Sequence, residues 1–466
     1  MTVVRSPCGL ATCNGAHNGR WLEVKGQLGM QATGWGRSSA LSATWETEGV
    51  TSPNLPQSTD VLVVGAGPAG SAAAAWAADL GHDVVLADSA TFPRDKSCGD
   101  GLTPRAIAEL DRLGLADWVR SHTVNQGLRA HGFGQILELP WPGGSLPDHG
   151  SAVPRTELDD RIRTAALDRG ALGVEGARAV DVERDGDRVS GVVFEKDGDK
   201  NQRHTVNCQT LVVADGVRSQ LGRVLGREWH RDTVYGVAGR AYIDSERSDD
   251  PWISSHLELR GMEGELLSGY GWIFPLGSGQ VNVGVGTLAT SKRPANIQLR
   301  PLMQFYADAR APEFKLSGPL RSPTSALLPM GGAVSGVAGA NWALIGDSAG
   351  CVNPLNGEGI DYGMETGRLV VQSIHNGDHL GSTWPSLLTD HYGEAFSIAR
   401  RLAGLITVPK LLPAAGPIGM RSTWMMTLAL RWMGNLITDE DRDIAARIWR
   451  LAGKASVKID HRPPFS

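Results

Sequence analysis

Three glycines in residues 60–71 stand where a chain could bind the phosphates of a dinucleotide. An apolar run leads directly into the six residues Gly65, Ala66, Gly67, Pro68, Ala69 and Gly70, and an alanine-rich helical pattern continues to Leu80. In such a turn the first glycine permits the tight bend, the second lets the backbone approach a pyrophosphate, and the third lets helix and strand pack closely. The helix start adds free N–H groups and the positive end of its dipole.

Asp88 completes this pattern. It ends a second apolar run, 83–87, and lies eighteen residues beyond Gly70, where an acid can accept hydrogen bonds from a ribose. Glycine-rich turns are common, so the turn alone is weak evidence. The order strand, turn, helix, strand and acid predicts a dinucleotide site made by residues 65–70 and Asp88.

Two further motifs narrow the type of dinucleotide. Residues 211–219 end an apolar run at Asp215 and Gly216, and residues 342–350 end another at Gly346 and Asp347. A glycine-rich turn at 353–361 then opens a helix. In this order the motifs resemble the large flavoprotein family that includes aromatic hydroxylases, flavin halogenases and geranylgeranyl reductases, over roughly residues 58–400. The resemblance implies FAD, with its ADP half on the first motif.

By the same resemblance, Asp347 meets the ribityl–pyrophosphate part of FAD, and the helix start at Gly359 and Ile360 lies near the flavin ring. Arg155 resembles the family's arginine at the start of a helix that lies over the FAD. The alternative role for Arg155 is an ordinary salt bridge at the surface.

Residues 93–105 carry Cys98, Gly99, Asp100 and Gly101, which resemble the Cys-Gly-x-Gly loop of geranylgeranyl reductases. In that family the loop runs past the flavin ring, so these four residues are expected at the cofactor. A thiol beside a flavin is a candidate proton donor or relay. The alternative is a structural cysteine, because free cysteines often behave as small buried hydrophobes.

Residues 269–276 resemble the Tyr-x-Trp-x-Phe-Pro pattern of prenyl reductases. Side chains on a strand alternate between its faces, so Tyr270, Trp272 and Phe274 are expected on one side. Such a stripe is most often core. Flavin halogenases carry a Trp-rich strand ending in Ile-Pro at this place, whereas the tyrosine and the phenylalanine here favour a reductase.

A prenyl reductase must move hydride from a flavin to an isolated alkene, which requires protonation and places positive character on the tertiary carbon. The ring faces of Tyr270 and Trp272 could stabilise that charge by about 0.5–2 kcal/mol each, and the rings would exclude water. The proton donor is either the Cys98 thiol or the Tyr270 hydroxyl. Cys98, Tyr270 and Trp272 are therefore the predicted catalytic residues.

The motifs at 93–105, 269–276, 328–339 and 462–466 resemble members of this family that saturate one isoprene unit in the tail of menaquinone, over about residues 59–466. Menaquinone is accordingly the expected substrate and dihydro-menaquinone the expected product. The alternatives are geranylgeranyl diphosphate or a geranylgeranylated lipid, a flavin monooxygenase or halogenase reaction, and a redox sensor or quinone-binding protein without turnover. A diphosphate would need a cluster of Lys or Arg or a magnesium-binding pair of acids, and the predicted substrate domain at 229–329 shows none.

Composition excludes several other functions. A formal net charge of -5 and the lack of a basic, aromatic-rich run argue against nucleic acid. The five cysteines contain no Cys-x-x-Cys pair, which excludes an internal electron relay and indicates a reducing compartment. The donor is then external, either NAD(P)H or a reductase. His204, His230 and His256 fall at no ligand spacing, so no metal is expected.

The order of elements predicts an α/β fold. We expect a Rossmann-type FAD-binding domain made of two separate stretches of chain, 59–228 and 330–400. An antiparallel β-sheet substrate domain is expected between them, at 229–329. A C-terminal helical segment that faces lipid is expected at 401–466. Helices are expected at 156–169, at 362–378 and from 385 into the low 400s. Strands are expected at 234–242, 255–260, 270–275 and 280–287, a β-meander at 174–213, and a turn-rich segment at 127–151.

The two ends of the chain differ. Residues 1–58 lack any period and are expected to be disordered or an over-extended gene start, with Val50 as an alternative start. No signal peptide or stretch of roughly 18 apolar residues occurs, so a cytoplasmic, peripheral enzyme on the inner face of the membrane is expected. The apolar segment 401–438, with Met420, Trp424 and Met425 among basic residues, is either core or a surface for anionic lipid.

Overall fold

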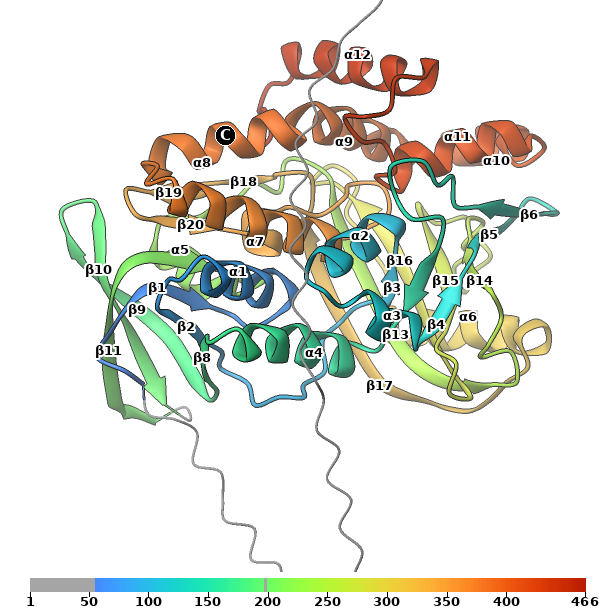
Figure 1. The fold of residues 1–466 in the computed structure, drawn as a ribbon. Coiled ribbons are helices and arrows are strands. Elements are labelled where there is room, and N and C mark those ends of the chain that lie inside the picture. Colours follow the sequence, from blue (N-terminus) through green and yellow to red (C-terminus); the bar gives the residue numbers. More distant parts are fainter. Residues whose placement is uncertain (1–54, 197–198) are drawn as a thin grey trace, which may run out of the picture. The chain divides into compact units, whose positions relative to one another are not determined.

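A mixed eight-stranded sheet forms the first layer of the computed structural model, which describes residues 55–196 and 199–466. Its parallel part runs in the order β20 (Trp342–Leu344), β11 (Asp199–Val213), β1 (Ser58–Val64), β2 (Val84–Ala87) and β8 (Leu172–Val174). The strands β9 (Ala177–Asp185) and β10 (Arg188–Lys196) extend β11 as an antiparallel meander, and β19 (Ala338–Gly339) pairs with β20 (Figure 1). The α/β fold and the predicted meander are confirmed.

Three helices carry the loops of the site over this sheet. The helix α1 (Pro68–Asp79) packs against α4 (Arg155–Asp168) and α7 (Ile360–His375). The approach of α7 is close, because a Cβ on Gly367 would lie 2.6 Å from the carbonyl oxygen of Ala69. This contact brings the start of α7 beside the first glycine turn, although the two lie far apart in sequence.

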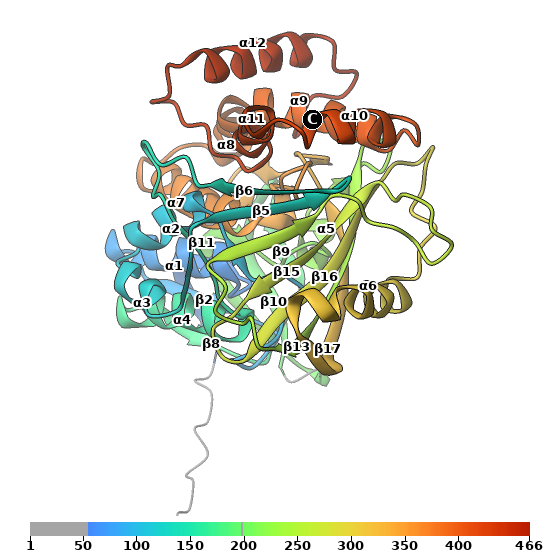
Figure 2. The ribbon, with the colours of Figure 1, turned by 90° about the vertical axis from the view of Figure 1, so that its right-hand side faces the viewer.

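A seven-stranded sheet forms the second layer. Its order is β17 (Leu316–Pro329), β13 (Tyr235–Ser245), β16 (Gln280–Ala289), β15 (Gly269–Pro275), β14 (Trp252–His256), β5 (Gly127–Gly132) and β6 (Gln135–Pro140). The helix α6 (Leu299–Phe314) packs on one face of this sheet, where Ile273, Val283 and Tyr306 share a core (Figure 2). Neither α6 nor β17 was predicted, and β14 begins and ends earlier than the expected strand at 255–260.

The predicted turn-rich segment at 127–151 is wrong, because it holds β5 and β6. The strand β5 pairs in parallel with β14, with His131 opposite His256. This pairing joins strands more than a hundred residues apart, which no local pattern reveals. The second sheet is consequently built from more than the inserted residues 229–329.

Short elements join the two layers. A three-stranded sheet is formed by β3 (Gly101–Leu102), β7 (Gly150–Ala152) and β4 (Thr123–Asn125), next to α2 (Pro104–Arg112) and α3 (Ala116–Arg120). The helix α5 (Gln220–Val224) follows Asp215, and β12 (Glu228–Trp229) pairs with β18 (Val334–Ser335). These connections hold the loop before β3 between the sheets.

Helices at one end of the molecule complete the fold (Figures 1 and 2). They are α8 (Leu380–Leu388), a π-helical turn (Thr389–Gly393), α9 (Glu394–Ile406), α10 (Leu411–Gly419), α11 (Thr423–Met433) and α12 (Ile444–Lys458). The predicted continuous helix from 385 is interrupted by the π turn, and α12 was not predicted. No single helix in the described ranges is long and apolar enough to cross a bilayer, but the bent pair Leu380–Ile406 and Leu411–Gly419 meets those criteria together, with a 109° bend.

The expectation that residues 1–58 are disordered or an over-extended start falls on residues outside those that the structure describes, apart from the last four.

Candidate active site

One cavity of about 850 Å³ brings the predicted motifs together. Its wall contains fourteen of the predicted site residues, namely Gly65, Gly67, Pro68, Ala69, Asp88, Cys98, Gly99, Gly101, Arg155, Tyr270, Trp272, Asp347, Gly359 and Ile360. The three others, Ala66, Gly70 and Asp100, lie behind this wall. The cavity thus joins the turn after β1, the loop before β3, the second sheet and the start of α7.

The glycine turn is shaped for a large ligand. Gly65 has a φ of +104°, and a Cβ on Gly70 would lie 1.8 Å from the carbonyl oxygen of Gly65, so both positions need glycine. Gly67 differs, because the nearest described atom to its added Cβ would be an Arg94 nitrogen at 3.5 Å. The space in front of Gly67 is therefore open, at the start of a helix that has no side-chain cap.

Asp88, which follows the end of β2, stabilises this turn by hydrogen bonds. Its two carboxylate oxygens accept hydrogen bonds from Ala66 N at 2.7 Å and Ala90 N at 2.8 Å. Each oxygen keeps a second lone pair, and Asp88 also lines the cavity. Its predicted bond to a ribose is compatible with this placement and stays a prediction.

A cluster of positive charge stands beside the turn. Arg155, the first residue of α4, is 7% exposed and makes a paired hydrogen bond to Asp159 at 2.5 and 2.7 Å, and Arg94 reaches the same carboxylate at 2.9 Å. The alternative of a surface salt bridge for Arg155 is wrong because the pair is buried. Lys96 also lines the cavity, and burial lowers its pKa while Asp347 opposes that shift. Three cations thus face Asp159 and Asp347, and Arg94 is placed to meet a phosphate at Gly67.

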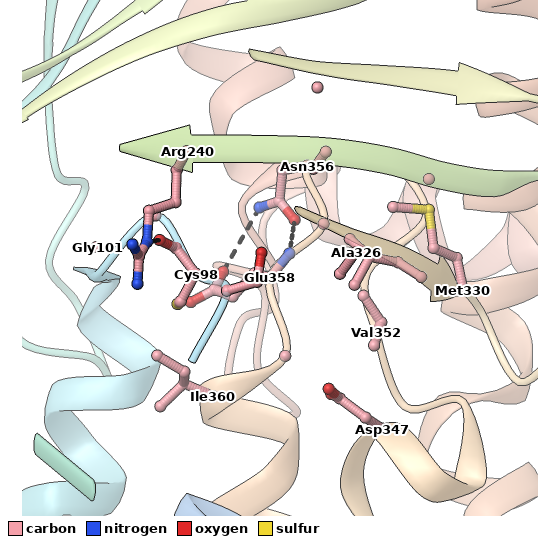
Figure 3. A pocket seen from close by; sticks show the side chains of 18 of the residues that line it. Cys98, Gly101, Arg240, Ala326, Met330, Asp347, Val352, Asn356, Glu358 and Ile360 are labelled. Atoms are coloured by element: carbon pink, nitrogen blue, oxygen red, sulfur yellow. Dashed lines mark hydrogen bonds between the residues drawn. The ribbon is translucent and has the colours of Figure 1, made fainter. Parts of the chain in front are cut away.

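The Cys98 loop is fastened to the second sheet from behind. The Cys98 carbonyl accepts a hydrogen bond from Arg240 Nε at 3.3 Å (Figure 3) and another from Asn282 Nδ2 at 3.0 Å. Asp100 N donates to Cys98 Sγ at 3.3 Å. Burial raises the pKa of the Cys98 thiol, so the group is protonated at neutral pH. The structure is compatible with a relay and with a structural cysteine.

Asp100 holds this loop in place and does not face the cavity. It adopts a φ of +62°, and its Oδ2 accepts hydrogen bonds from Tyr242 Oη and Asn282 Nδ2, both at 2.8 Å. Burial raises the pKa of Asp100 to about 6. Contact between Asp100 and a cofactor stays a prediction.

The aromatic stripe lies on one face of β15, as predicted. Ring centroids of Tyr270 and Trp272 are 5.8 Å apart, and those of Trp272 and Phe274 are 6.3 Å apart. Trp272 Nε1 donates to Asn282 Oδ1 at 2.8 Å, and a Cβ on Gly284 would collide with the Trp272 ring at 2.1 Å. The rings are packed like core residues and also line the cavity.

Tyr270 is poorly placed to release a proton. Its hydroxyl donates to the carbonyl oxygen of Asn356 at 2.5 Å, and burial raises the pKa of this phenol. The bond instead fixes the turn that precedes α7. A Cβ on Gly359 in this turn would lie 3.0 Å from the Asp347 carboxylate, which explains the glycine there.

Sequence reasoning missed several residues of this site. Arg94 and Lys96 follow Asp88 in the quoted loop, and two basic residues just after the ribose acid are the signal that could have found them. Asn282 ties Trp272 to the Cys98 loop and Tyr242 holds Asp100, but a lone polar residue on a strand carries no signal. Glu358, on the cavity wall, stood unassigned inside a glycine-rich motif.

The far part of the cavity is apolar and reaches the C-terminal helices. Its wall there is formed by side chains from α9, α10, α11 and the second sheet, among them Ile406, Leu412, Met420, Met426, Leu430, Leu128, Leu139 and Ile253. A polar, positively charged end and an apolar end therefore meet at the Cys98 loop and the Tyr270 strand.

His256 has ligand-type neighbours that the sequence did not suggest. Its ring, that of His131 and the Glu313 carboxylate place their ligand atoms within 4.8 Å of one another. The two imidazoles stack at 4.3 Å with 22° between their planes, and Tyr306 Oη lies 2.6 Å from His256 Nδ1. Stacked rings direct their lone pairs side by side, so one ion cannot lie in both ring planes.

Comparison with known proteins agrees with the sequence motifs. A family model for an FAD binding domain matches residues 58–254. The menaquinone reductase of Mycolicibacterium smegmatis is 62% identical over 87% of this chain and 99% of its own length. That of Mycobacterium tuberculosis is 60% identical over 89% of this chain and 100% of its own length.

Solved structures of low identity share the fold. A geranylgeranyl bacteriochlorophyll reductase-like protein from Thermoplasma acidophilum has a TM-score of 0.66 at 20% identity, covering 86% of this chain and 96% of its own. A flavin-dependent brominase has a TM-score of 0.67 at 19% identity, covering 86% of this chain and 100% of its own. The fold is thus common to reductases and halogenases.

The cofactor of the family is FAD, and the residues present fit it. The open face of Gly67, the uncapped start of α1 and the Arg94, Lys96 and Arg155 side chains suit its pyrophosphate. Asp88 lines the same cavity at the end of β2, where its predicted bond to a ribose is sterically possible. With 60–62% identity over nearly the whole of both mycobacterial relatives, this chain belongs to the menaquinone reductase family of FAD-dependent oxidoreductases.

Proposed function

We propose that this protein is an FAD-dependent menaquinone reductase that saturates one isoprene C=C bond in the quinone's side chain and yields dihydro-menaquinone. The observation that carries the proposal is the two-ended cavity. Its charged end fits the cofactor and its apolar end fits a polyprenyl chain. The relatives named menaquinone reductase support the same substrate.

The chain's own residues prepare the alkene for reduction. Reduced FAD supplies a hydride when bound. Tyr270 and Trp272 line the cavity with their rings fixed by hydrogen bonds to Asn356 and Asn282, so their faces can stabilise positive character on the tertiary carbon by about 0.5–2 kcal/mol each. The apolar wall excludes water that would trap this charge.

The position of the saturated bond follows from the shape of the substrate. A tail threaded past Tyr270 and Trp272 presents only one depth to the hydride, and the quinone ring is too bulky to follow it inward. The ring therefore acts as a stop, and a unit near the ring is reduced. Electrons come from NAD(P)H or a reductase that visits the protein.

The proposal is tested with purified, FAD-loaded protein that has been reduced without oxygen. Menaquinone incubated with it should gain about two mass units, as expected for saturation of one C=C bond. A gain of about 16 units would indicate a monooxygenase instead.

We also propose that the C-terminal helices lie against the inner face of the membrane. Trp424 is 73% exposed and Ile418 64%, on the same α10 and α11 that wall the apolar branch. Met420 and Leu430 of the same segment are buried, so the core alternative holds for part of it. The free thiols of the described residues accord with the reducing cytoplasmic side.

The basic residues of this surface differ in whether their charge is available to bind lipid. Lys410 and Arg421 are exposed beside the apolar side chains. Arg431 donates instead to Asp443 at 2.7 Å, so its charge is already neutralised within the protein. Attraction to anionic lipid therefore rests on Lys410 and Arg421.

Replacing Trp424 and Met425 together by Ser should weaken binding to anionic phospholipid vesicles about tenfold or more, because two apolar side chains no longer enter the lipid. Vesicle sedimentation measures this change. Leu80→Ser, at the 44% exposed end of α1, is the control and should bind like the wild type. Unchanged sedimentation of the double variant would mean that the segment 401–438 does not bind lipid through these side chains and serves only as part of the core.

A further inference from the structure

Glu358 is an acid on the cavity wall to which the sequence motifs assign no role. It lies in the turn 356–359, held from one side by the Tyr270 hydroxyl on Asn356 O. Its backbone N–H donates to Asn356 Oδ1 at 2.9 Å, which holds the backbone of the turn at Glu358. Figure 3 shows the Glu358 carboxyl between the Cys98 loop and Asn356, on the side that faces the cavity.

The two oxygens of this carboxyl differ. Oε1 accepts a hydrogen bond from Thr103 Oγ1 at 2.5 Å. Oε2 has only a long contact, 3.5 Å, with Asn356 Nδ2. An acid proton is therefore best placed on Oε2, where no strong donor competes with it.

The charges around Glu358 favour its neutral form. Burial raises its pKa well above the ordinary value, and the nearby Asp361 carboxylate raises it further. Thr103, Asn356 and the Arg105 guanidinium oppose the shift without reversing it. A carboxyl group is ordinarily a stronger acid than a thiol or a phenol. The two groups predicted as donors, the Cys98 thiol and the Tyr270 phenol, also have pKa values raised by burial.

We propose that Glu358 is the general acid of this enzyme, donating its proton to the less substituted alkene carbon while hydride reaches the tertiary carbon, where the positive character develops. This inference rests on the proposed function. The C=C π bond and the Glu358 O–H bond break, two C–H bonds form, and two electrons leave the reduced cofactor. The resulting carboxylate takes up a proton from solvent between turnovers.

Glu358→Gln in the FAD-loaded enzyme should lower the single-turnover rate of dihydro-menaquinone formation by about 100-fold or more. Rapid quenching and mass spectrometry measure the saturated product itself, since direct reduction of the quinone ring would also reoxidise the flavin. FAD content and Tm should match the wild type. Glu358→Asp, which keeps the acid, should recover part of the rate.

The pH profile separates a proton donor from a structural group. The active form is the protonated one, so the wild-type rate should be highest at low pH and fall as pH rises through the raised pKa of Glu358. Glu358→Gln should lack this fall. Cys98→Ser and Tyr270→Phe, whatever their rates, should both retain the fall with pH, because the proton donor is still present.

Two results would contradict the role of Glu358, and a third would contradict the proposed function itself. A Glu358→Gln enzyme with the wild-type rate and pH profile would overturn the inference, as would a loss of rate that is matched by loss of FAD or of Tm. If the wild-type protein itself yields no saturated quinone, the proposed function fails before Glu358 is tested.

Discussion

Gly67→Val should give a folded protein that purifies without flavin colour. Gly67 has a φ of -72°, which any residue adopts, and an added Cβ would meet the Arg94 side chain only at 3.5 Å, so the fold tolerates the change. The valine side chain would instead occupy the space that the FAD pyrophosphate needs. Overpacking at this point costs about 3 kcal/mol, or roughly a hundredfold in Kd for FAD.

The measurement is the ratio of flavin to protein absorbance, together with Tm. Gly404→Val is the matched control, because no described atom lies within 4 Å of a Cβ at that position in α9. This control should purify yellow. If the Gly67→Val protein keeps its full FAD content, the pyrophosphate does not bind at Gly67 and the prediction is wrong.

Ala429→Trp should separate binding of FAD from turnover of menaquinone. Ala429 lines the apolar branch on α11, so an indole there fills the path of the prenyl chain. We expect kcat/KM for menaquinone to fall about 10–100-fold, which corresponds to 1–3 kcal/mol of overpacking. FAD content should not change.

Thr427→Trp is the control for this variant, because Thr427 lies on the same helix and is absent from the cavity wall. It should keep kcat/KM near the wild-type value. Equal losses of kcat/KM in both variants would mean that the substitutions only perturb the α11 helix. No loss in either variant would mean that the prenyl tail does not pass Ala429.

Local patterns correctly predicted the arrangement of strand, glycine turn and acid at residues 58–88. The apolar run of β1, the turn at Gly65 and the acid at Asp88 are neighbours in sequence, so their spacing alone fixes their geometry. The stripe of Tyr270, Trp272 and Phe274 followed from the two-residue period of a strand. Such features depend on few long-range contacts.

Long-range contacts account for what was missed. The strands β5 and β14 pair across the two halves of the chain, which turned a predicted loop into part of the substrate sheet. Asn282 can join Trp272 to the Cys98 loop by hydrogen bonds only because tertiary folding places it between the Trp272 ring and the Cys98 carbonyl. The raised pKa of Glu358 arises from its burial beside Asp361, and this burial depends on the tertiary packing of α7.

The central claim is that one C=C bond of the menaquinone tail is saturated. The most direct test is mass spectrometry of menaquinone after incubation with the reduced, FAD-loaded protein in the absence of oxygen. We predict a gain of about two mass units, with fragment ions that place the saturated unit near the ring. A gain of about 16 units, an unchanged quinone, or saturation of geranylgeranyl lipids alone would contradict the account.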